Sequence, residues 1–509
     1  MKRYEVIANI IDILAIVLLL FIPVYMVIIV FSIASATNIH TLIFNAFLLV
    51  VEVFGLIFSY YLVDMIGGSI FYRTKITSTA TDASGTPFFS IIIPSHGTPF
   101  SILEQTLKGA QNLSYKNYEL IVSDNGKNRS ITEMLQKFCK ENGIDFYHKK
   151  DERGFKAGNI NAVLNLTKGD FIVILDSDHI PVPNLLEEFS SIINDPSIGF
   201  IQAKVSYRNV NRLYQKANSI LYSQFYEVIE SAKDRRGMVL FNGTTGCFRR
   251  TVLQEIGGFS EDTLIEDIDT SMQIISRGYK GRFINFIGSY GLVPSTAKAQ
   301  VAQLWRWTHG ACNILRIRLR LFLTSSQIGW FKKFELILNT MAFFSGISIV
   351  VFFSILALMI TFDIEILRQS ILGFSTLYIM PFLVSLSYST IAILTILWED
   401  REESLFTRIL HLIPFYLLSL GSFLFLISGV LEGLLLYNTP KSETGVWDRH
   451  FNILRNSIIA IAYTGLILFL ALFALPNEYS YFIIGGTLTW FFAPFILIWE
   501  EIFPPKEDT

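Results

Sequence analysis

The sequence predicts an α/β domain with a doubly wound, mostly parallel sheet, inserted between transmembrane α-helices. Apolar runs cover Val6–Ile33 and Leu42–Val63 and resume from Phe334 onward, and about 20 apolar residues suffice to cross a bilayer. Between these runs, from Thr74 to about Gln300, the chain turns polar and alternates short apolar runs with segments of helical spacing. Such alternation is typical of parallel sheets whose two faces are covered by helices.

The composition narrows the class of protein. Hydrophobic residues make up 51% of the 509 residues and charged residues only 17%, below the usual quarter. The net charge of −2 lacks the basic excess typical of nucleic-acid binding, so we expect no nucleic-acid partner. Cys139, Cys247 and Cys312 have no paired spacing, which argues against a disulfide framework or a zinc site.

Residues 1–73 are expected to form two N-terminal transmembrane helices. The first apolar run is too long for a signal-peptide core, and no small-residue cleavage pattern precedes the second run. Glu52 lies midway along the second run. An acid inside a span is a functional candidate by default, and the alternative is a hydrogen bond from a protonated Glu to a neighbouring helix.

Residues 74–298 are expected to form the α/β domain. Short apolar runs bounded by turn residues predict strands at 88–94, 118–124, 144–148, 170–176 and 198–205. Helical spacing between these runs predicts helices at 101–113, 131–139, 156–166 and 184–193. Ligands of such sheets bind at the carboxyl ends of the strands. Ser95, Asp124 and Asp176 lie at three of these ends, so we expect them on one rim of the sheet.

Residues 299–330 predict amphipathic interfacial helices, and residues 331–509 a second transmembrane region. Its expected spans are Phe334–Ile360, Ile371–Trp398, Ile458–Leu475 and Ser480–Trp499. The segment 406–436 is also apolar, but Pro414 and several Ser and Gly residues interrupt it. It crosses, re-enters or lies at the interface, which gives seven spans or six. We prefer six, because the following loop carries Lys441 and Arg449 and basic loops are usually cytoplasmic.

Charge also sets the expected orientation in the cell membrane. The span ends nearest the α/β domain carry six basic residues: Lys2, Arg3, Arg73, Lys75, Lys332 and Lys333. The opposite loops, SATNIH (35–40) and PNEYS (476–480), carry neither Lys nor Arg. By the positive-inside rule the α/β domain is cytoplasmic in a multi-pass membrane protein.

Two carboxylates, Asp176 and Asp178, follow a predicted strand in VILDSDHIP (173–181). No G-x-G-x-x-G follows the first strand and the P-loop pattern is absent, so dinucleotide-binding and P-loop folds are excluded. A D-x-D pair can hold one Mg²⁺ or Mn²⁺ that bridges a diphosphate. The alternative is that the two acids belong to a solvated loop or a helix cap. Their position at the end of a strand and the nearby Lys156 argue against this alternative.

Three further stretches carry candidate residues, each with a structural alternative. In TLIEDIDTS, Glu266 and Asp267 either complement a helix dipole or supply a general base, Asp267. In QLWRWTHG, Arg306 lies between two Trp residues in an amphipathic helix, where a guanidinium also suits a diphosphate and an indole suits a sugar ring. FNGTTG, with Gly243 and Thr244, is a turn or a loop that binds a polyol.

Taken in order, these stretches resemble the membrane-embedded family 2 glycosyltransferases of the cellulose-synthase-like group. The resemblance runs from about Phe88 to Asn313 and more loosely through Trp447. It rests on IIIPSHG, VSDNG, FKAGNINAVL, DSDHIP, on IEDIDT for the family's T-E-D, and on Gln303, Arg306 and Trp307 for Q-x-x-R-W. Ile265 stands where the family usually has Thr. FNGTTG followed by IEDIDT leans toward the mannan and glucan synthase branches.

The resemblance implies a GT-A-like fold and a role for each matching residue. Asp267, with Glu266 beside it, would be the catalytic base of an inverting transfer. The metal would be Mg²⁺ or Mn²⁺, held by Asp176 and Asp178 with His179 as a less certain ligand. Donor contacts would come from Ser95, Asp124, Lys156, Asp176, Gln303 and Arg306, and acceptor contacts from Trp307, Gly243 and Thr244. Residues 437–450 are similar to the family's gating loop, with Thr439 and Lys441 in matching places.

The leading hypothesis is a processive enzyme that polymerises a β-linked polysaccharide and translocates it across the membrane. Its donor is a nucleoside-diphosphate sugar, with a UDP-sugar favoured and GDP-mannose as the alternative, and its acceptor is the growing polysaccharide. A second hypothesis is a non-processive enzyme that adds one sugar to a lipid. A third is a transporter or receptor with a degenerate nucleotide-binding domain, against which the intact acids and Q-x-x-R-W argue.

Overall fold

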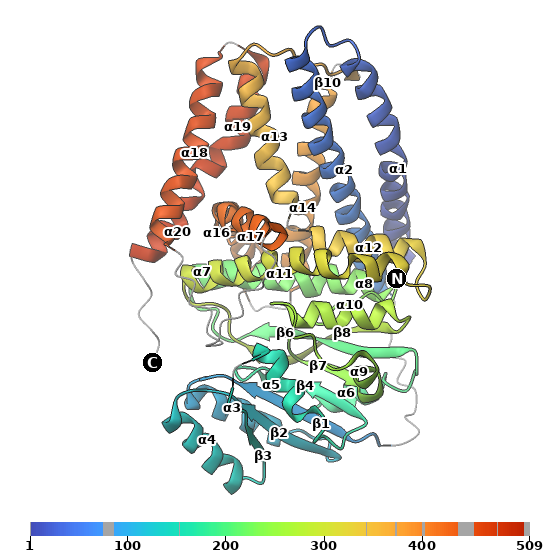
Figure 1. The fold of residues 1–509 in the computed structure, drawn as a ribbon, viewed down its shortest axis with the longest axis vertical. Coiled ribbons are helices and arrows are strands. Elements are labelled where there is room, and N and C mark those ends of the chain that lie inside the picture. Colours follow the sequence, from blue (N-terminus) through green and yellow to red (C-terminus); the bar gives the residue numbers. More distant parts are fainter. Residues whose placement is uncertain are drawn as a thin grey trace.

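The structure, a computed structural model, describes residues 2–74, 86–151, 153–342, 344–371, 374–399, 403–435, 452–475 and 477–502. It has three levels (Figure 1): upright helices at one end, an α/β domain at the other, and a layer of helices lying across the molecule between them.

The α/β domain is built on an eight-stranded mixed sheet with the order β3-β2-β1-β4-β7-β6-β8-β5. Its strands are β1 (Phe89–Ser95), β2 (Tyr118–Asp124), β3 (Asp145–His148), β4 (Phe171–Ile174), β5 (Ile180–Pro181), β6 (Ile198–Tyr207), β7 (Gly246–Arg249) and β8 (Lys280–Gly291). The pairs β1–β2, β1–β4, β2–β3 and β6–β8 are parallel. The pairs β4–β7, β6–β7 and β5–β8 are antiparallel. The strands β3, β2, β1 and β4 form the parallel part of the sheet that was predicted. The antiparallel strand β7 joins β4 to β6 and so links this part to the remaining strands.

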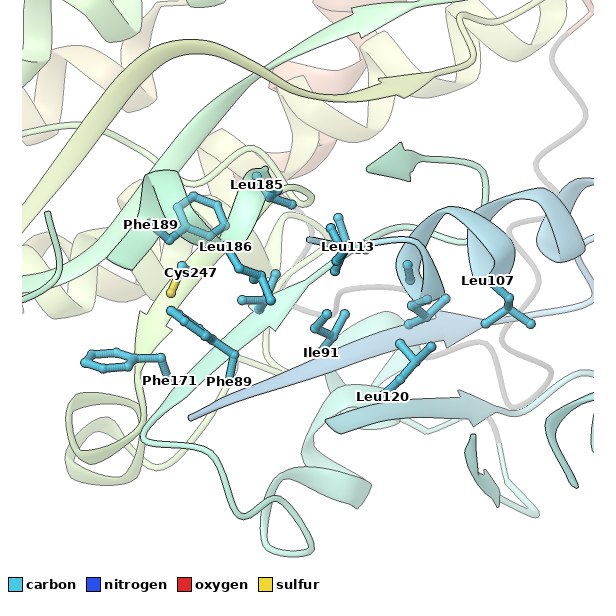
Figure 2. Packing of buried hydrophobic residues seen from close by; sticks show 14 of the residues in the cluster. Phe89, Ile91, Leu107, Leu113, Leu120, Phe171, Leu185, Leu186, Phe189 and Cys247 are labelled. Carbon is cyan, nitrogen blue, oxygen red and sulfur yellow. The ribbon is translucent and has the colours of Figure 1, made fainter. Parts of the chain in front are cut away.

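Helices cover both faces of this sheet. They are α3 (Phe100–Gln111), α4 (Arg129–Glu141), α5 (Phe155–Leu164), α6 (Leu185–Ser190), α9 (Arg250–Ile256) and α10 (Glu266–Ser276). Ile91 packs in one hydrophobic cluster with residues of α3, α4 and α6, and its neighbour Ile92 packs in another with residues of α5 and α9. Figure 2 shows the first cluster, where Leu107 of α3 and Leu186 of α6 lie over the strands. Burial on both faces explains why the strands read as continuous apolar runs.

The middle layer begins with α7 (Leu213–Gln224), which continues through a π-helical turn, η1 (Phe225–Glu230), into α8 (Ser231–Asp234). The other helices at this level are α11 (Ala297–Thr324), α12 (Trp330–Met341), α16 (Leu412–Gly421) and α17 (Phe423–Leu435). The short helix α15 (Leu405–Leu410) leads into α16. Gly429 and Gly433 of α17 face α11, where an added Cβ would come within 3.0 Å of Thr308 and 2.6 Å of the His309 carbonyl. Small residues therefore let α17 lie directly on α11.

The upright level contains α1 (Lys2–Ile33), α2 (Ile39–Thr74), α13 (Phe344–Thr361), α14 (Ile379–Trp398), α18 (Ile453–Phe473), α19 (Glu478–Phe492) and α20 (Pro494–Ile502). Among the described residues, five helices are long and apolar enough to cross a membrane, at Glu5–Ile33, Ile39–Arg73, Thr376–Trp398, Ile453–Phe473 and Tyr479–Trp499. Two short strands, β9 (Ser370–Ile371) and β10 (Phe374–Ser375), lie with η2 (Thr376–Tyr378) at the end of the bundle far from the α/β domain.

The single span expected at Phe334–Ile360 is wrong, because the structure divides this segment between α12 and α13. Glu335 of α12 is buried and its Oε2 accepts from Nε of Arg236 at 2.9 Å, while Asn339 accepts from the Tyr61 hydroxyl at 2.6 Å. These polar contacts hold α12 in the middle layer. The 18 residues of α13 give a length of about 27 Å, close to the hydrocarbon thickness of a bilayer.

The interrupted apolar segment 406–436 forms α15, α16 and α17. The stretches Leu405–Gly421 and Phe425–Leu435 meet at an angle of 41°. Figure 1 shows α16 and α17 close above α11, well below the far ends of α13 and α18. This placement agrees with an interfacial or re-entrant segment, the arrangement that the six-span prediction requires.

Glu52 has a cationic partner that the sequence did not indicate. Arg368, from the segment between α13 and β9, donates to its two carboxylate oxygens at 3.1 and 2.9 Å, and both side chains are fully buried. Arg368 also donates to Oδ1 of Asn45 at 3.0 Å. The acid is therefore part of a polar network with a cation, rather than making the hydrogen bond from a protonated Glu that was the structural alternative.

Candidate active site

The predicted D-x-D pair lies directly after β4, on the rim of the sheet. Oxygens of Asp176 and Asp178 and a ring nitrogen of His179 lie within 4.8 Å of one another, the one group among the described residues that could hold a metal ion. The two Asp side chains are each 32% exposed, whereas His179 is buried and lies 2.8 Å from Asp178 through Nδ1. The two carboxylates suit Mg²⁺ or Mn²⁺, so this pair fits such an ion.

Lys156, at the start of α5, connects the D-x-D pair to the Gly- and Thr-rich loop. Its ammonium lies 2.5 Å from Oδ1 of Asp176 and donates to the carbonyl of Gly243 at 2.6 Å. Burial would lower the pKa of Lys156, but the charges of Asp176, Glu266 and Asp267 outweigh burial and raise it. The site therefore holds a permanent positive charge beside the first aspartate.

Backbone conformations with positive φ flank this connection. Gly154 (φ 75°) and Phe155 (φ 50°) lead into α5, and Thr245 (φ 55°) follows the loop residue Thr244. A non-glycine residue held in the left-handed region costs about 1–3 kcal/mol, and such residues concentrate at functional sites. Both segments that meet at Asp176 thus carry strain that the surrounding structure must hold.

Glu266 and Asp267 form the first turn of α10, as predicted, and Asp267 approaches the same loop. A Cβ added to Gly243, whose φ is 90°, would lie 3.0 Å from Oδ2 of Asp267 and 3.4 Å from Nζ of Lys156. Only glycine combines this φ with this close approach. Burial raises the pKa of Asp267 to about 7, and the neighbouring charge of Glu266 adds to the effect. A carboxyl with this pKa can accept a proton near neutral pH.

The loop FNGTTG is anchored to the rim by hydrogen bonds that the sequence did not indicate. Thr244 Oγ1 accepts from the backbone N–H of Asp176 at 2.9 Å. Gln202 of β6 donates to the Thr244 carbonyl at 3.0 Å and accepts from the N–H of Asn242 at 2.9 Å. Because β7 follows this loop and lies between β4 and β6, the loop is placed directly over the D-x-D pair.

Ser95 and Asp124 are direct partners in the register of β1 and β2, which places them at one point of the rim. Asp124 Oδ2 accepts from Thr132 Oγ1 at 3.0 Å and lies 3.1 Å from Nδ1 of His148. One residue that sequence reasoning missed is Asn159. Its amide donates to the carbonyls of Ser95 at 3.0 Å and Ser123 at 2.7 Å, and so ties the ends of β1 and β2 together.

The Q-x-x-R-W residues lie on α11 in the middle layer. Tyr222 of α7 donates a hydrogen bond to Gln303, and its ring meets the Trp307 ring edge-on at 5.5 Å between centroids. Arg306 is exposed, and its charge acts to lower the pKa of Asp267. Tyr222 was missed because its contacts join segments about 80 residues apart.

The predicted residues thus fall into three groups. Lys156, Asp176, Gly243, Thr244 and Asp267 are brought together, Ser95 and Asp124 lie along the same rim, and Gln303 and Trp307 cluster with Tyr222 at the adjoining helices. Thr439 and Lys441 lie outside the described residues.

This combination of a mixed α/β sheet, an acidic rim and flanking apolar helices defines a GT-A-like glycosyltransferase domain in a membrane protein. The chain belongs to glycosyl transferase family group 2, whose model matches residues 171–499.

Three comparisons illustrate the range of similarity. The UDP-forming cellulose synthase catalytic subunit of Xanthomonas axonopodis is 27% identical over 241 residues, covering 45% of this chain and 32% of that protein. A probable glucomannan 4-beta-mannosyltransferase of Arabidopsis thaliana is 25% identical over 264 residues, covering 49% of each. A mannosyltransferase from Pyrobaculum calidifontis, solved with GDP-mannose and Mn²⁺, has 17% identity and a TM-score of 0.49, covering 76% of this chain and 99% of that one. The chain spans about a third to a half of the length of the two curated relatives.

Proposed function

We propose that this chain is a processive, inverting glycosyltransferase that builds a β-linked polysaccharide from a nucleoside-diphosphate sugar and translocates it across the membrane. The observation that carries the proposal is the position of the Asp267 carboxyl, which meets Gly243 beside the Lys156–Asp176 pair and has its pKa raised to about 7. Family membership and the similarity to cellulose and glucomannan synthases support the choice of polymer.

The proposed reaction is a single displacement. Asp267 accepts the proton of the acceptor hydroxyl, whose oxygen attacks the anomeric carbon as the bond to the diphosphate breaks. Attack from the face opposite the leaving group inverts the anomeric centre, and the nucleoside diphosphate leaves. Lys156 and Arg306 offset the negative charge that develops on it. Glu266 tunes the base by keeping a negative charge next to Asp267.

Asp176, Asp178 and His179 are the proposed ligands of Mg²⁺ or Mn²⁺. Such an ion, when bound, neutralises charge on the diphosphate. The protein's own part is to present the two carboxylates from one rigid strand end, with Lys156 and Thr244 holding Asp176 in place.

Donor and acceptor are assigned to opposite sides of the D-x-D pair. The nucleoside is proposed to lie over Ser95 and Asp124, and its sugar near Asp176. The UDP-forming activity in the name of a cellulose synthase relative favours a UDP-sugar, with GDP-mannose as the alternative. Gln303 and Arg306 frame the diphosphate, and Trp307, Gly243 and Thr244 face the acceptor. The Trp307 ring next to Tyr222 supplies the apolar face on which a sugar can pack.

The proposed placement has the α/β domain in the cytoplasm and the upright helices in the cell membrane. The proposed divisions are residues 1–73, 74–298, 299–330 and 331–509, with 406–436 interfacial and 437–450 as a gating loop that uses Thr439 and Lys441. Arg73 at the end of α2 and Lys332 in α12 lie at the domain side, which supports this orientation.

The test is to incubate membranes containing the chain with a panel of labelled nucleotide sugars and Mg²⁺ or Mn²⁺, and to analyse the product. A ladder of long β-linked polymer is expected, absent in Asp267→Asn. A single labelled glycolipid would instead identify a non-processive enzyme, and full turnover by Asp267→Asn would refute the proposed base. Polymer protected inside sealed inverted vesicles is the expected sign of translocation.

A further inference from the structure

A cavity lies where the edge of the sheet meets the ends of α2 and α14. Its volume is about 770 Å³, within the range of about 300–1,000 Å³ that is usual for ligand sites. It is lined by Arg73, Val182, Asn184, Lys204, Asn285, Phe286, Ile287, Tyr290, Leu397, Trp398, Glu399 and Arg408. The residues assigned to sugar transfer are absent from this lining, so the cavity needs an explanation of its own.

The cavity wall carries an excess of cations. Arg73 and Lys204 both form ion pairs with one fully buried acid, Glu227. Glu399, the acid in the lining, accepts a hydrogen bond from Ser223 at 2.7 Å. Arg408 uses Nη1 to donate to the carbonyls of Ile396 and Glu399, both at 2.8 Å. Among the residues that the structure describes here, three cations thus stand against two carboxylates.

Two guanidinium groups of this wall keep unused donors. Within the described part of the chain, Nε of Arg73 and Nε of Arg408 are buried and have no hydrogen-bond partner. A buried donor without an acceptor costs about 1–3 kcal/mol, more when the group is charged. These two Nε atoms are sealed from the cavity, but both arginine side chains line it, and guanidinium groups are well suited to phosphate oxygens.

The position of the cavity favours one source for that anion. Arg73 ends α2, and Trp398 ends α14, two helices that are candidate membrane spans. The Arg73 guanidinium lies over the Trp398 ring, 4.3 Å from its centroid. Tryptophan is enriched at the level of lipid headgroups, and basic pockets at the cytoplasmic ends of spans bind anionic headgroups.

We propose that this cavity binds the phosphate group of an anionic phospholipid, and so anchors the sheet edge to the membrane. The assignment to a lipid rests on the membrane placement proposed above, whereas the affinity for phosphate rests only on the cavity. The headgroup phosphate would lie among the three cations of the lining, Arg73, Lys204 and Arg408, with its acyl chains along the apolar ends of the two spans.

The test uses the purified full chain in nanodiscs of phosphatidylcholine with labelled phosphatidylglycerol, and counts the labelled lipid retained after detergent extraction. We compare Arg408→Gln and Lys204→Gln with Arg455→Gln, which removes an exposed cation at the start of α18 outside the cavity. Wild type and Arg455→Gln should retain a single labelled lipid per chain. The two cavity variants should bind it about tenfold more weakly, as expected for the loss of one charge-assisted hydrogen bond.

A second arm titrates inorganic phosphate against the same proteins in phosphatidylcholine alone and follows thermal unfolding. Stabilisation of wild type by phosphate, without lipid retention, would assign a soluble phosphate compound and overturn the lipid. Equal lipid retention by cavity variants and Arg455→Gln, with no phosphate effect, would overturn the site altogether. If Arg408→Gln fails to fold, Lys204→Gln decides, because Glu227 keeps Arg73 as its partner. Lipid counting needs no sugar transfer, so its result is independent of the proposed activity.

Discussion

Two acids, the half-buried Asp267 on the rim of the sheet and the fully buried Glu52 in the bundle, differ in what surrounds them. Glu52 has both carboxylate oxygens occupied by Arg368, within a network that also includes Asn45. Asp267 has another acid, Glu266, as its sequence neighbour, and its Oδ2 faces Gly243, which offers no side chain. The first acid has a complete set of partners, whereas the second keeps one side open.

This difference separates a structural charge from a reactive one. A buried ion pair with all its hydrogen bonds made is a closed unit, and removing one partner leaves the other uncompensated. A carboxyl that is buried beside a like charge instead has a raised pKa, which is the state that a general base needs near neutral pH. Four substitution experiments, ordered from the largest expected effect to the smallest, test this distinction.

Asp267→Asn should lower kcat by about 10³-fold, because general base catalysis contributes about 10²–10⁴-fold. Its thermal stability should stay the same or rise, since a negative charge next to that of Glu266 is removed. Turnover of labelled nucleotide sugar and a melting curve measure the two effects. Asp262→Asn, at a largely exposed acid just before α10, is the matched control and should change neither. A stability loss as large as the activity loss would make Asp267 structural.

Arg368→Gln should show the opposite pattern. It leaves Glu52 buried without its partner, which costs about 3–5 kcal/mol, while the activity of the molecules that remain folded should be unchanged. Chemical unfolding in detergent measures the loss. The double variant Glu52→Gln with Arg368→Gln should recover much of it. A double variant no more stable than the single one would show that the network is not closed as described.

Asp178→Ala should raise the Mn²⁺ or Mg²⁺ concentration needed for half-maximal turnover. Loss of a partner that only orients a metal ligand costs about 10–100-fold in affinity, so a direct ligand should cost at least as much. His179→Ala distinguishes the two roles for the imidazole, which lies 2.8 Å from Asp178. If His179→Ala raises the required metal concentration as much as Asp178→Ala does, His179 is a metal ligand. A smaller increase would make His179 only a neighbour of the metal site. No shift in either variant would contradict the metal site.

The pH dependence of kcat should follow the Asp267 carboxyl. Its raised pKa means that the group is protonated below about pH 7, so turnover should fall about tenfold per unit as pH drops below that value. Glu266→Gln removes the second cause of the raised pKa and should move this limb to lower pH. An acid limb that stays in place in Glu266→Gln would show that another group controls it.

The sequence predicts much of this site and of its supporting strands because both are local. The strands β1, β2 and β3 lie within one residue of their predicted positions, since runs such as FFSIIIP carry the pattern of a doubly buried strand. The strand β7 was missed because it follows a Gly- and Thr-rich loop and has only four residues. Asn159 and Gln202 were missed because their roles depend on backbone groups far away in the chain.

The sequence by itself determined the order of the elements, the apolar helices and the acidic residues at the strand ends. The spacing of apolar residues, the local composition and the residues that follow each apolar run are properties of neighbouring residues. They can therefore be recognised without knowledge of the fold. Only the tertiary structure decided that β7 inserts between β4 and β6 and places Gly243 against Asp267, and that Arg368 closes on Glu52. It also decided that α12 separates from α13. Each of these features depends on residues that are far apart in the sequence and come together only in the fold. Those contacts decide which side chains are buried and which charged groups become partners.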